Sequence, residues 1–249
     1  IFSTGVDAEG NPSEYAHHIK TKGVAVTGLQ LKPSSRISAD FWNYWLENIS
    51  NNSYGRAVAA VAPKVKVGVE ALYQFRVGNG GNPEEALAYF PDQKQWLAGG
   101  MVAYEPASWH LSLNYLHTDG NGRFLFPREW GREQFFATIS RGRIEGTGKS
   151  DIVVAKVRKQ WSDRFSSEAA VARAWLPATD DYRYNKYGAT SYLGWVTDLN
   201  YKPANPVLHG LSFRLLYIGR VSPDTDMPLK DMYYNTNFHN LNFVTQLTF

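Results

Sequence analysis

The sequence predicts an all-β protein, an antiparallel transmembrane β-barrel with short turns at one end and long loops at the other. Three observations predict it. The last segment, 239–249, alternates apolar and polar side chains residue by residue. Short breakers alternate along the chain with long polar connections. Aromatic residues make up 14% of the chain, yet no apolar run approaches the ~18 residues that a membrane helix needs.

The terminal segment carries two different walls. Side chains of a strand point alternately to its two faces. One face therefore holds Leu241, Phe243, Thr245, Leu247 and Phe249, and the other holds Asn240, Asn242, Val244, Gln246 and Thr248. A strand that is apolar on one side, hydrated on the other and ends on an aromatic residue is typical of the last strand of a bacterial outer-membrane barrel.

Composition agrees with a membrane barrel and excludes several other classes. The chain has 8 Trp and 15 Tyr, residues that collect where a bilayer meets water. It has no Cys, which argues against a disulfide framework or a thiolate metal site. A net charge of +3 is too small to indicate a nucleic-acid partner. The chain begins with Ile1 and shows no signal peptide, which indicates a mature or an incomplete sequence.

Two kinds of breaker alternate along the chain. The short ones contain Pro, Ser, Asp or Asn, the residues of tight turns, and lie at 32–36, 62–64, 105–108, 161–164 and 202–206. The long ones are 78–94, 118–149, 177–188 and 222–235, with one short exception around 50–52. Short turns on one side and long loops on the other are the periplasmic and extracellular ends of an outer-membrane barrel.

The segments between breakers are about the length of a tilted membrane strand. The clearest, 65–76, places Val65, Val67, Val69 and Tyr73 outside and Lys66 inside. Segments 109–115, 193–202 and 211–217 repeat this alternation. Two segments stay ambiguous: 37–49 has aromatic residues on both faces, and 168–176 leaves the face of Arg173 open.

Counting back from the periplasmic end at Phe249 gives about eleven strands and places residues 1–21 in an extracellular loop. Single-chain bacterial barrels have an even number of strands. Either a strand within 135–143 escapes the count, or an odd number of strands is missing before Ile1. We favour the second, because the chain direction stays consistent at every short turn. Residues 1–249 are therefore interpreted as one barrel domain that lacks its N-terminal strands.

Basic side chains on the inner faces are the main functional signal. The predicted lumenal basic ladder, our candidate solute-binding set, consists of Arg56, Lys66, Arg76, Lys156, Arg158, Arg214 and Arg220. Arg and Lys rings in a pore favour anions, and guanidinium forks pair bidentately with carboxylates. The alternative is that these residues only line the interior, paired with neighbours such as Glu70 or Asp198.

Other candidate sites are weaker. His110, Ser112 and Asn114 share one face and resemble the residue types of a barrel phospholipase, but they would face the lumen, so we expect no enzyme activity. In the longest loop, Arg128, Arg132, Arg141 and Arg143 could form an anion-collecting mouth or only face sugars and water. No metal site and no cofactor are expected.

Three stretches resemble the OprD family of outer-membrane porins. They are 109–115 continuing into 117–124, then 195–201 with the following turn and 210–214, and finally 240–249. The resemblance implies an 18-stranded barrel, trimeric or monomeric, that passes small carboxylates or amino acids along a basic ladder. It also implies that the inward-folding constriction loop lies in the missing N-terminal half. The 118–149 connection departs from the family pattern.

The sequence therefore predicts a porin of the Gram-negative outer membrane for passive diffusion of small anionic or zwitterionic solutes. Its expected surroundings are membrane lipid and lipopolysaccharide, with a homotrimer or envelope proteins as partners. The alternative function is a plugged barrel that serves as a scaffold or subunit of an outer-membrane assembly. A third, weaker reading is a soluble lipocalin-like barrel, whose apolar face would turn inward.

Overall fold

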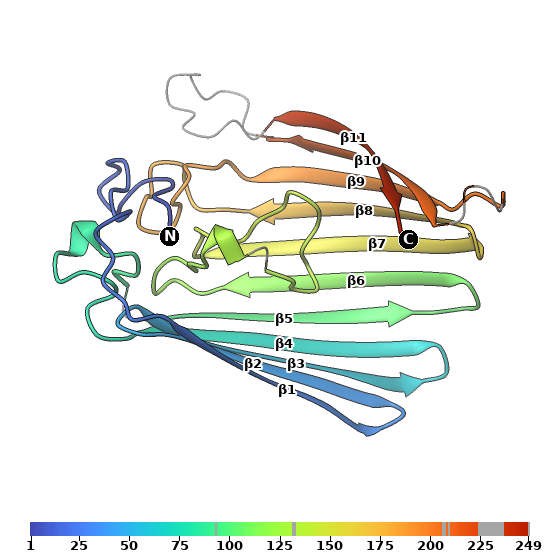
Figure 1. Cartoon of the computed structure of the whole chain (residues 1–249), viewed down its shortest axis with the longest axis horizontal. Helices are drawn as coiled ribbons and strands as arrows, with labels where there is room; N and C mark the ends of the chain where they lie inside the picture. Colours follow the sequence, from blue (N-terminus) through green and yellow to red (C-terminus); the bar gives the residue numbers. More distant parts are fainter. Residues whose placement is uncertain (93, 131–132, 206–207, 209, 224–236, 249) are drawn as a thin grey trace.

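Eleven antiparallel strands form a single sheet in which every strand pairs with its neighbours in sequence (Figure 1). The computed structural model describes residues 1–248 except 93, 131–132, 206–207, 209 and 224–236. The strands are β1 (Val24–Ser34), β2 (Ile37–Leu46), β3 (Ser50–Ala62), β4 (Val65–Arg76), β5 (Lys94–Tyr104), β6 (Trp109–Thr118), β7 (Ser150–Ser162), β8 (Phe165–Trp175), β9 (Tyr192–Tyr201), β10 (Leu211–Val221) and β11 (Phe238–Leu247). The predicted all-β fold and strand number are confirmed for these residues.

The connections have the predicted asymmetry. Tight turns join strands at one end of the sheet and long connections join them at the other (Figure 1). Two short 3-10 helices, η1 (Glu85–Leu87) and η2 (Arg128–Trp130), lie in the long connections. Residues 1–21 lie at the loop end, as expected. The 135–143 segment contains an isolated bridge between Ile139 and Gly142 rather than a strand. The predictions for Phe249, Arg132, Pro206 and most of 222–235 concern residues outside those described.

The outer wall is apolar, as the alternation predicts. Val69, Leu113 and Leu241 are 63%, 59% and 67% exposed on the convex face. The ambiguous strands are now assigned by pairing: in β2, Phe41 and Trp45 face outward while Trp42 and Tyr44 face inward. Arg173 pairs with Val153 and Leu193, which places it on the outer face. The apolar face therefore does not turn inward, as it would in a soluble lipocalin-like barrel.

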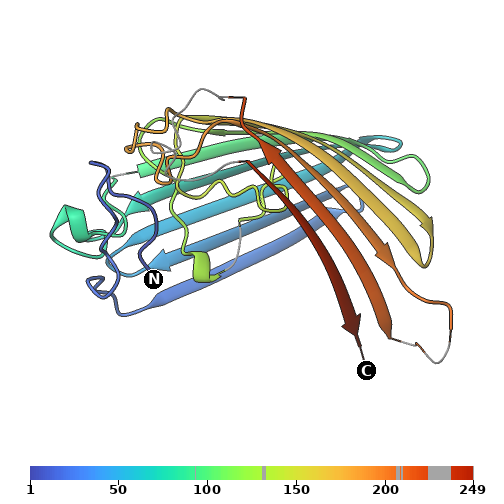
Figure 2. The ribbon, with the colours of Figure 1, turned by 90° about the horizontal axis from the view of Figure 1, so that it is seen from above.

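The inner wall differs from the expected polar lining. Leu72, Leu116 and Val154 lie on the inner parity and are buried in a core cluster. They pack against apolar residues of the 119–149 connection, including Phe124 and Ile144. Figure 2 shows this connection inside the curve of the sheet. Apolar residues occur on the inner wall because a loop, rather than water, covers them.

The sheet is not closed within the described residues. β1 pairs only with β2, and β11 pairs only with β10. Both edges therefore present backbone donors and acceptors without a partner strand, which Figure 2 shows as the gap between the two ends of the curved sheet. Separately, no helix among the described residues has the length and apolar character required to cross a bilayer.

We predict that replacing Leu113, at the centre of the outer face of β6, by Arg destabilises the folded protein in lipid. A basic residue at the lipid-facing midplane of a barrel costs about 2–4 kcal/mol. Leu113→Phe, which keeps the face apolar, is the matched control and should be nearly neutral. Reversible unfolding from lipid vesicles measures both. Equal stability of the two variants would contradict the assignment of this face to lipid.

Candidate solute pathway

The 119–149 connection is fixed to the inner wall at three places. Gln74 exchanges hydrogen bonds with the backbone of Leu125, its Oε1 accepting from the amide and its Nε2 donating to the carbonyl. Glu70 Oε1 accepts the Phe136 amide at 2.6 Å. Lys156 Nζ donates to the carbonyls of Phe136 and Thr138, both at 2.9 Å. The described residues of this connection, 119–130 and 133–149, therefore form an inner loop that lies across the concave face.

The sequence did not predict this inner loop. The resemblance implied that the constriction loop lies in the missing N-terminal half, which this structure does not contain; in addition, the 119–149 connection folds inward within this chain. The physical reason is visible in its composition: Phe124, Leu125, Phe135, Ile139 and Ile144 are too apolar for a solvated loop and are buried against the sheet. The high content of apolar residues in this long connection is the sequence feature that could have predicted a buried loop. The alternation within the strands carries no information about it.

A cavity rich in arginine lies between the inner loop and β9–β11. Its volume is about 780 Å³. The arginines that line it are Arg128, Arg141, Arg143, Arg214 and Arg220. The acidic residue among its described lining residues, Glu145, is 1% exposed at its side chain and is paired with Arg128 and Lys186. We call this space the arginine cavity. The charged residues of its lining are therefore predominantly cationic.

The arginine cavity continues toward the turn end of the sheet past Arg214. Arg214 also lines a second cavity beside Glu168 and Lys156, and a third near Arg164 and Lys202 at the turn end. Three adjoining hollows therefore share one side chain on the concave face of β10. Arg214 forms a two-pronged ion pair with Asp198, with Nη2 to Oδ2 at 2.6 Å and Nε to Oδ1 at 2.9 Å. The Asp198 carboxylate therefore orients the guanidinium of Arg214 and partly offsets its positive charge.

Some of the other predicted ladder residues form ion pairs with acidic side chains, and others donate hydrogen bonds to backbone carbonyls of the connections. Arg56 pairs with Asp40 at 2.8 Å, and Lys66 pairs with Glu105 at 2.6 Å. Arg76 Nη1 donates to the Pro91 carbonyl at the loop end. Lys156 anchors the inner loop.

Two further members lie at opposite ends of the inner wall. Arg220 stacks on Tyr192 at 3.6 Å and donates to the Arg141 carbonyl. Arg158 is exposed on the inner parity of β7 near the turn end. All seven side chains therefore occupy inward-facing positions of their strands, but they do not form one continuous row of cations available to a solute.

The partners of these cations were only partly foreseen. Asp198 pairs with a ladder arginine, as the interior-lining alternative predicts. Glu70 instead accepts hydrogen bonds from Tyr54 and from the inner loop. The sequence pattern places Glu105 in a turn; in the structure its carboxylate contacts both Lys66 and His110. Cross-strand register places Asp40 opposite Arg56, which sequence spacing alone does not establish.

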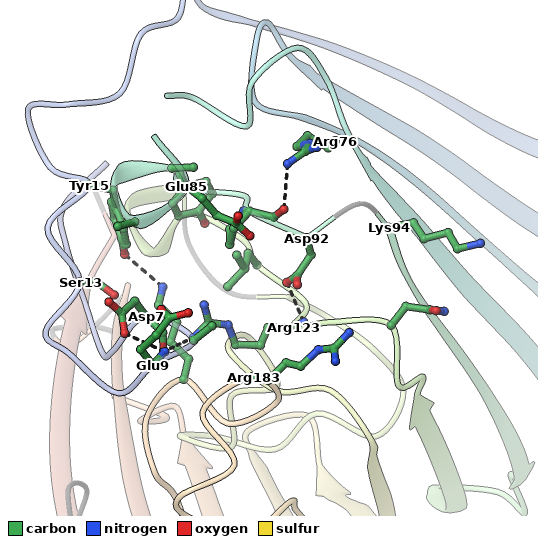
Figure 3. Close-up of a pocket in the computed structure, with 18 residues that line it drawn as sticks. Asp7, Glu9, Ser13, Tyr15, Arg76, Glu85, Asp92, Lys94, Arg123 and Arg183 are labelled. Carbon is green, nitrogen blue, oxygen red and sulfur yellow. Dashed lines mark hydrogen bonds between the residues drawn. The ribbon is translucent and has the colours of Figure 1, made fainter. Parts of the chain in front are cut away.

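A separate hollow, of about 590 Å³, lies at the loop end (Figure 3). Its lining includes side chains from residues 7–15, from residues 85–92, and Arg123 and Arg183. We call it the loop-end pocket. Burial raises the pKa of Asp92 and lowers the pKa of Arg123. Asp92 accepts the backbone amide of Arg123 at 3.0 Å.

The buried pair Lys186–Glu145 separates the two hollows. Lys186 lines the loop-end pocket and Glu145 lines the arginine cavity. The Lys186 ammonium lies 3.4 Å from Oε1 of Glu145 and donates to the Tyr15 hydroxyl at 3.1 Å. Residues 1–21 are thereby joined to the inner loop, since Phe2 N also donates to Glu129 at 2.5 Å.

The weaker candidates gain no support as reactive sites. Nδ1 of His110 lies 2.9 Å from Glu105, and Asn114 donates to Ser112 at 3.1 Å. The histidine is thus directed at a carboxylate rather than at the serine hydroxyl. Among the described residues, no group of three or more His, Asp or Glu side chains could hold a metal ion.

Solved structures of OprD- and Occ-type channels are similar to this fold. Acinetobacter baumannii OccAB4 has a TM-score of 0.69 at 12% identity, over 98% of this chain and 56% of that one. A variant of OccD1 (OprD) has 0.66 at 13% identity, over 98% and 62%. Pseudomonas aeruginosa OccK11 (OpdR) has 0.64 at 11% identity, over 90% and 57%.

These likenesses confirm the predicted resemblance at the level of the fold. The chain spans little more than half the length of the structures it matches. The sequence matches no protein-family model and no curated protein. At identities of 10–13%, the comparison establishes a partial OprD-like barrel and leaves the solute to be argued from the residues themselves.

We predict that Lys156→Met loosens the inner loop. The change removes two charge-assisted hydrogen bonds to backbone carbonyls, a local loss of about 1.5–3 kcal/mol. Hydrogen exchange at the Phe136 amide should therefore become at least about tenfold faster. Lys159→Met is the matched control, because Lys159 lies on the same strand but contacts Ser108 and Trp109 on the outer side. Unchanged exchange in Lys156→Met would contradict the anchoring role.

We predict a pH-dependent stabilisation at the periplasmic turn. A hydrogen bond from Lys66 lowers the pKa of Glu105 below its ordinary value. The stabilisation is therefore present above the unfolded pKa of about 4.3 and is lost as the pH falls through the lower folded pKa. Lys66→Met should raise the pKa of Glu105, measured by carboxyl-carbon NMR titration, whereas the nearby Lys64→Met should not. Equal effects of the two variants would overturn this attribution.

Proposed function

We propose that this chain is part of an outer-membrane β-barrel channel through which small solutes diffuse passively, with a preference for anionic or zwitterionic solutes such as carboxylates and amino acids. The fold shared with OprD and Occ channels supports the channel class. The arginine cavity and its continuation past Arg214 support the charge preference. A cationic wall in a narrow low-dielectric space raises the local concentration of anions.

In the proposed channel, the solute path runs between the inner loop and β9–β11. The inner loop packs against the central strands through Leu116 and Val154, and a smaller hollow of about 330 Å³ lies on its other side, beside Leu72 and Tyr54. By contrast, β10 and β11 border open hollows over much of their length. The loop thus narrows the lumen from one side and leaves the arginine-lined side for diffusion.

Closure of the barrel is part of the proposal. Lipid cannot satisfy the backbone groups at the free edges of β1 and β11, so a membrane-spanning sheet must be closed. We propose that strands outside this chain pair with both edges and complete a single barrel domain. Membrane lipid and lipopolysaccharide would then surround the apolar outer wall.

A plugged barrel that serves as a scaffold would use the same outer wall. The N-terminal segment and the inner loop occupy part of the interior in either case. The arginine cavity favours transport, because a scaffold does not require a row of cationic side chains along an open hollow. Single-channel recording of the intact protein in planar bilayers separates the two functions. Conductance steps with an anion preference support the channel, and an absence of conductance supports the scaffold.

We predict opposite effects for the two members of the Arg214–Asp198 pair. Arg214→Gln removes a positive charge from the proposed path and should lower the anion-to-cation permeability ratio. Asp198→Asn removes the offsetting carboxylate and should raise the ratio. A unit charge acting across 8 Å of water is worth about 0.5 kcal/mol, or roughly a twofold change. Reversal potentials in a KCl gradient give the ratio.

Arg173→Gln is the control for this charge series. It removes the same charge from the outer face, beside Trp175, and should leave the permeability ratio unchanged. A shift of equal size in Arg173→Gln, or a fall in anion preference with Asp198→Asn, would contradict the proposed path.

A further inference from the structure

One lysine on the apolar outer wall has no acidic partner. The Asp, Glu, Lys and Arg side chains that face outward from the described strands are Lys94, Asp151, Lys159 and Arg173. Lys159 is the one that lies in the turn-end half of the sheet, where it pairs across the strands with Trp109. Among the described residues, no carboxylate forms an ion pair with it. A positive charge therefore stands unneutralised on the wall that faces lipid.

Two tryptophan rings hold the ammonium of Lys159 in place. Its Nζ lies 4.5 Å from the centre of the Trp109 ring and 5.7 Å from that of Trp161, and it donates to Ser108 Oγ at 2.6 Å. Trp161 is itself oriented, because its Nε1 donates to Ser167 Oγ at 2.8 Å. Aromatic rings attract a cation without neutralising it, and an ammonium has three donors. We call Ser108, Trp109, Lys159 and Trp161 the lysine–tryptophan site; it presents a positioned cation with donors left for a ligand.

The lysine–tryptophan site lies at the depth of lipid headgroups. Trp109 begins β6 directly after a tight turn, and Trp161 lies one residue before the end of β7. The two rings are 39% and 58% exposed, and exposed tryptophans of a barrel collect where the bilayer meets water. A lysine on a lipid-facing wall extends its ammonium to this level, because hydrocarbon does not solvate it. At the periplasmic end of an outer-membrane barrel, the groups at this level are the phosphates of glycerophospholipids.

The charge of the neighbouring turns favours an anionic lipid over a zwitterionic one. The exposed basic residues of the described turn positions are Lys32, Arg36, Lys64, Arg164 and Lys202. The acids of the same turns are Glu105, which already contacts Lys66 and His110, and Asp163. Basic residues near a membrane surface attract lipids that carry a net negative charge. The turn end therefore has an excess of positive charge around the site.

We propose that the lysine–tryptophan site binds an anionic glycerophospholipid, whose phosphate accepts hydrogen bonds from the Lys159 ammonium and the Ser108 hydroxyl. The rings of Trp109 and Trp161 then lie against the glycerol and the first acyl carbons of this lipid. The inference rests on the proposed membrane-spanning barrel. It concerns the outer wall rather than the solute path, and it assigns a specific lipid contact to a residue that has no part in diffusion.

Native mass spectrometry of the intact protein in detergent tests the class of lipid. The probes are phosphatidylglycerol, phosphatidylcholine with the same acyl chains, and glycerol 3-phosphate, which has the phosphate but no chains. Phosphatidylglycerol should reach half-saturation at a concentration about fivefold lower than phosphatidylcholine, and glycerol 3-phosphate should not displace it. Equal retention of the two lipids, or displacement by glycerol 3-phosphate at an equal concentration, overturns the proposal.

Variants then assign the preference to Lys159. Lys159→Gln should lower the affinity for phosphatidylglycerol about fivefold, the effect of losing one exposed ion pair, whereas Lys159→Arg should retain most of it. Lys64→Gln is the matched control, because it removes the same charge from an exposed turn at the same end, and it should change the affinity less than twofold. Equal losses in Lys159→Gln and Lys64→Gln would assign the preference to the general charge of the turns and refute the site.

Folding and channel function are measured separately from lipid binding. The heat-modifiable electrophoretic mobility of each variant shows whether its barrel is folded, and the comparison of the two lipids on the unmodified protein decides the proposal should a variant fail to fold. A protein that prefers phosphatidylglycerol but does not conduct refutes the channel and keeps the site. One that conducts in bilayers without a lipid preference refutes only the site, and one that stays in solution without detergent refutes both.

Discussion

The requirement that every peptide group in lipid has a hydrogen-bond partner governs this structure. Each strand from β2 to β10 pairs on both sides with strands adjacent in sequence, so the backbone of the central sheet is satisfied locally. That pairing fixes which residues share a face, because a register shift of one residue would exchange the two walls. The outer placement of Val69 and Leu113 and the inner placement of Lys66 and Arg214 both follow from it.

The same pairing explains why the inner loop can be ordered. A concave sheet presents a row of inward side chains at fixed spacing, and Gln74, Glu70 and Lys156 provide matched donors and acceptors along it. Apolar residues of the loop then bury Leu72 and Leu116, so the loop gains both hydrogen bonds and removal of apolar area from water. A loop with only polar side chains would lack the stabilisation that comes from burying apolar area, and would remain solvated.

Strand alternation predicted the fold because it is a local property with a period of two. The eleven strands, the outer wall and the short turns all depend on residues within about ten positions of one another. The inner loop was not predicted, because Phe135 and Ile144 meet the sheet only after 119–149 has crossed the lumen. Likewise, the face of Arg173 was undecided until its pairing with Leu193 fixed the register. Ion pairs such as Lys66–Glu105 join separate hairpin ends, which spacing in the sequence does not reveal.

The pairing of the ladder cations bears directly on how such a wall can favour anions. A cation that is fully neutralised by a neighbour contributes little field, whereas an unscreened one would bind an anion too tightly to release it. Arg214 occupies the intermediate position: Asp198 orients the guanidinium and reduces its charge, yet the side chain remains 44% exposed beside three hollows. Lys156, by contrast, donates hydrogen bonds to two backbone carbonyls of the inner loop. Two of these basic residues of the inner wall therefore differ in their contacts: Lys156 holds the inner loop, whereas Arg214 lines the hollows beside it. In the proposed channel, only a residue of the second kind would act directly on a passing anion.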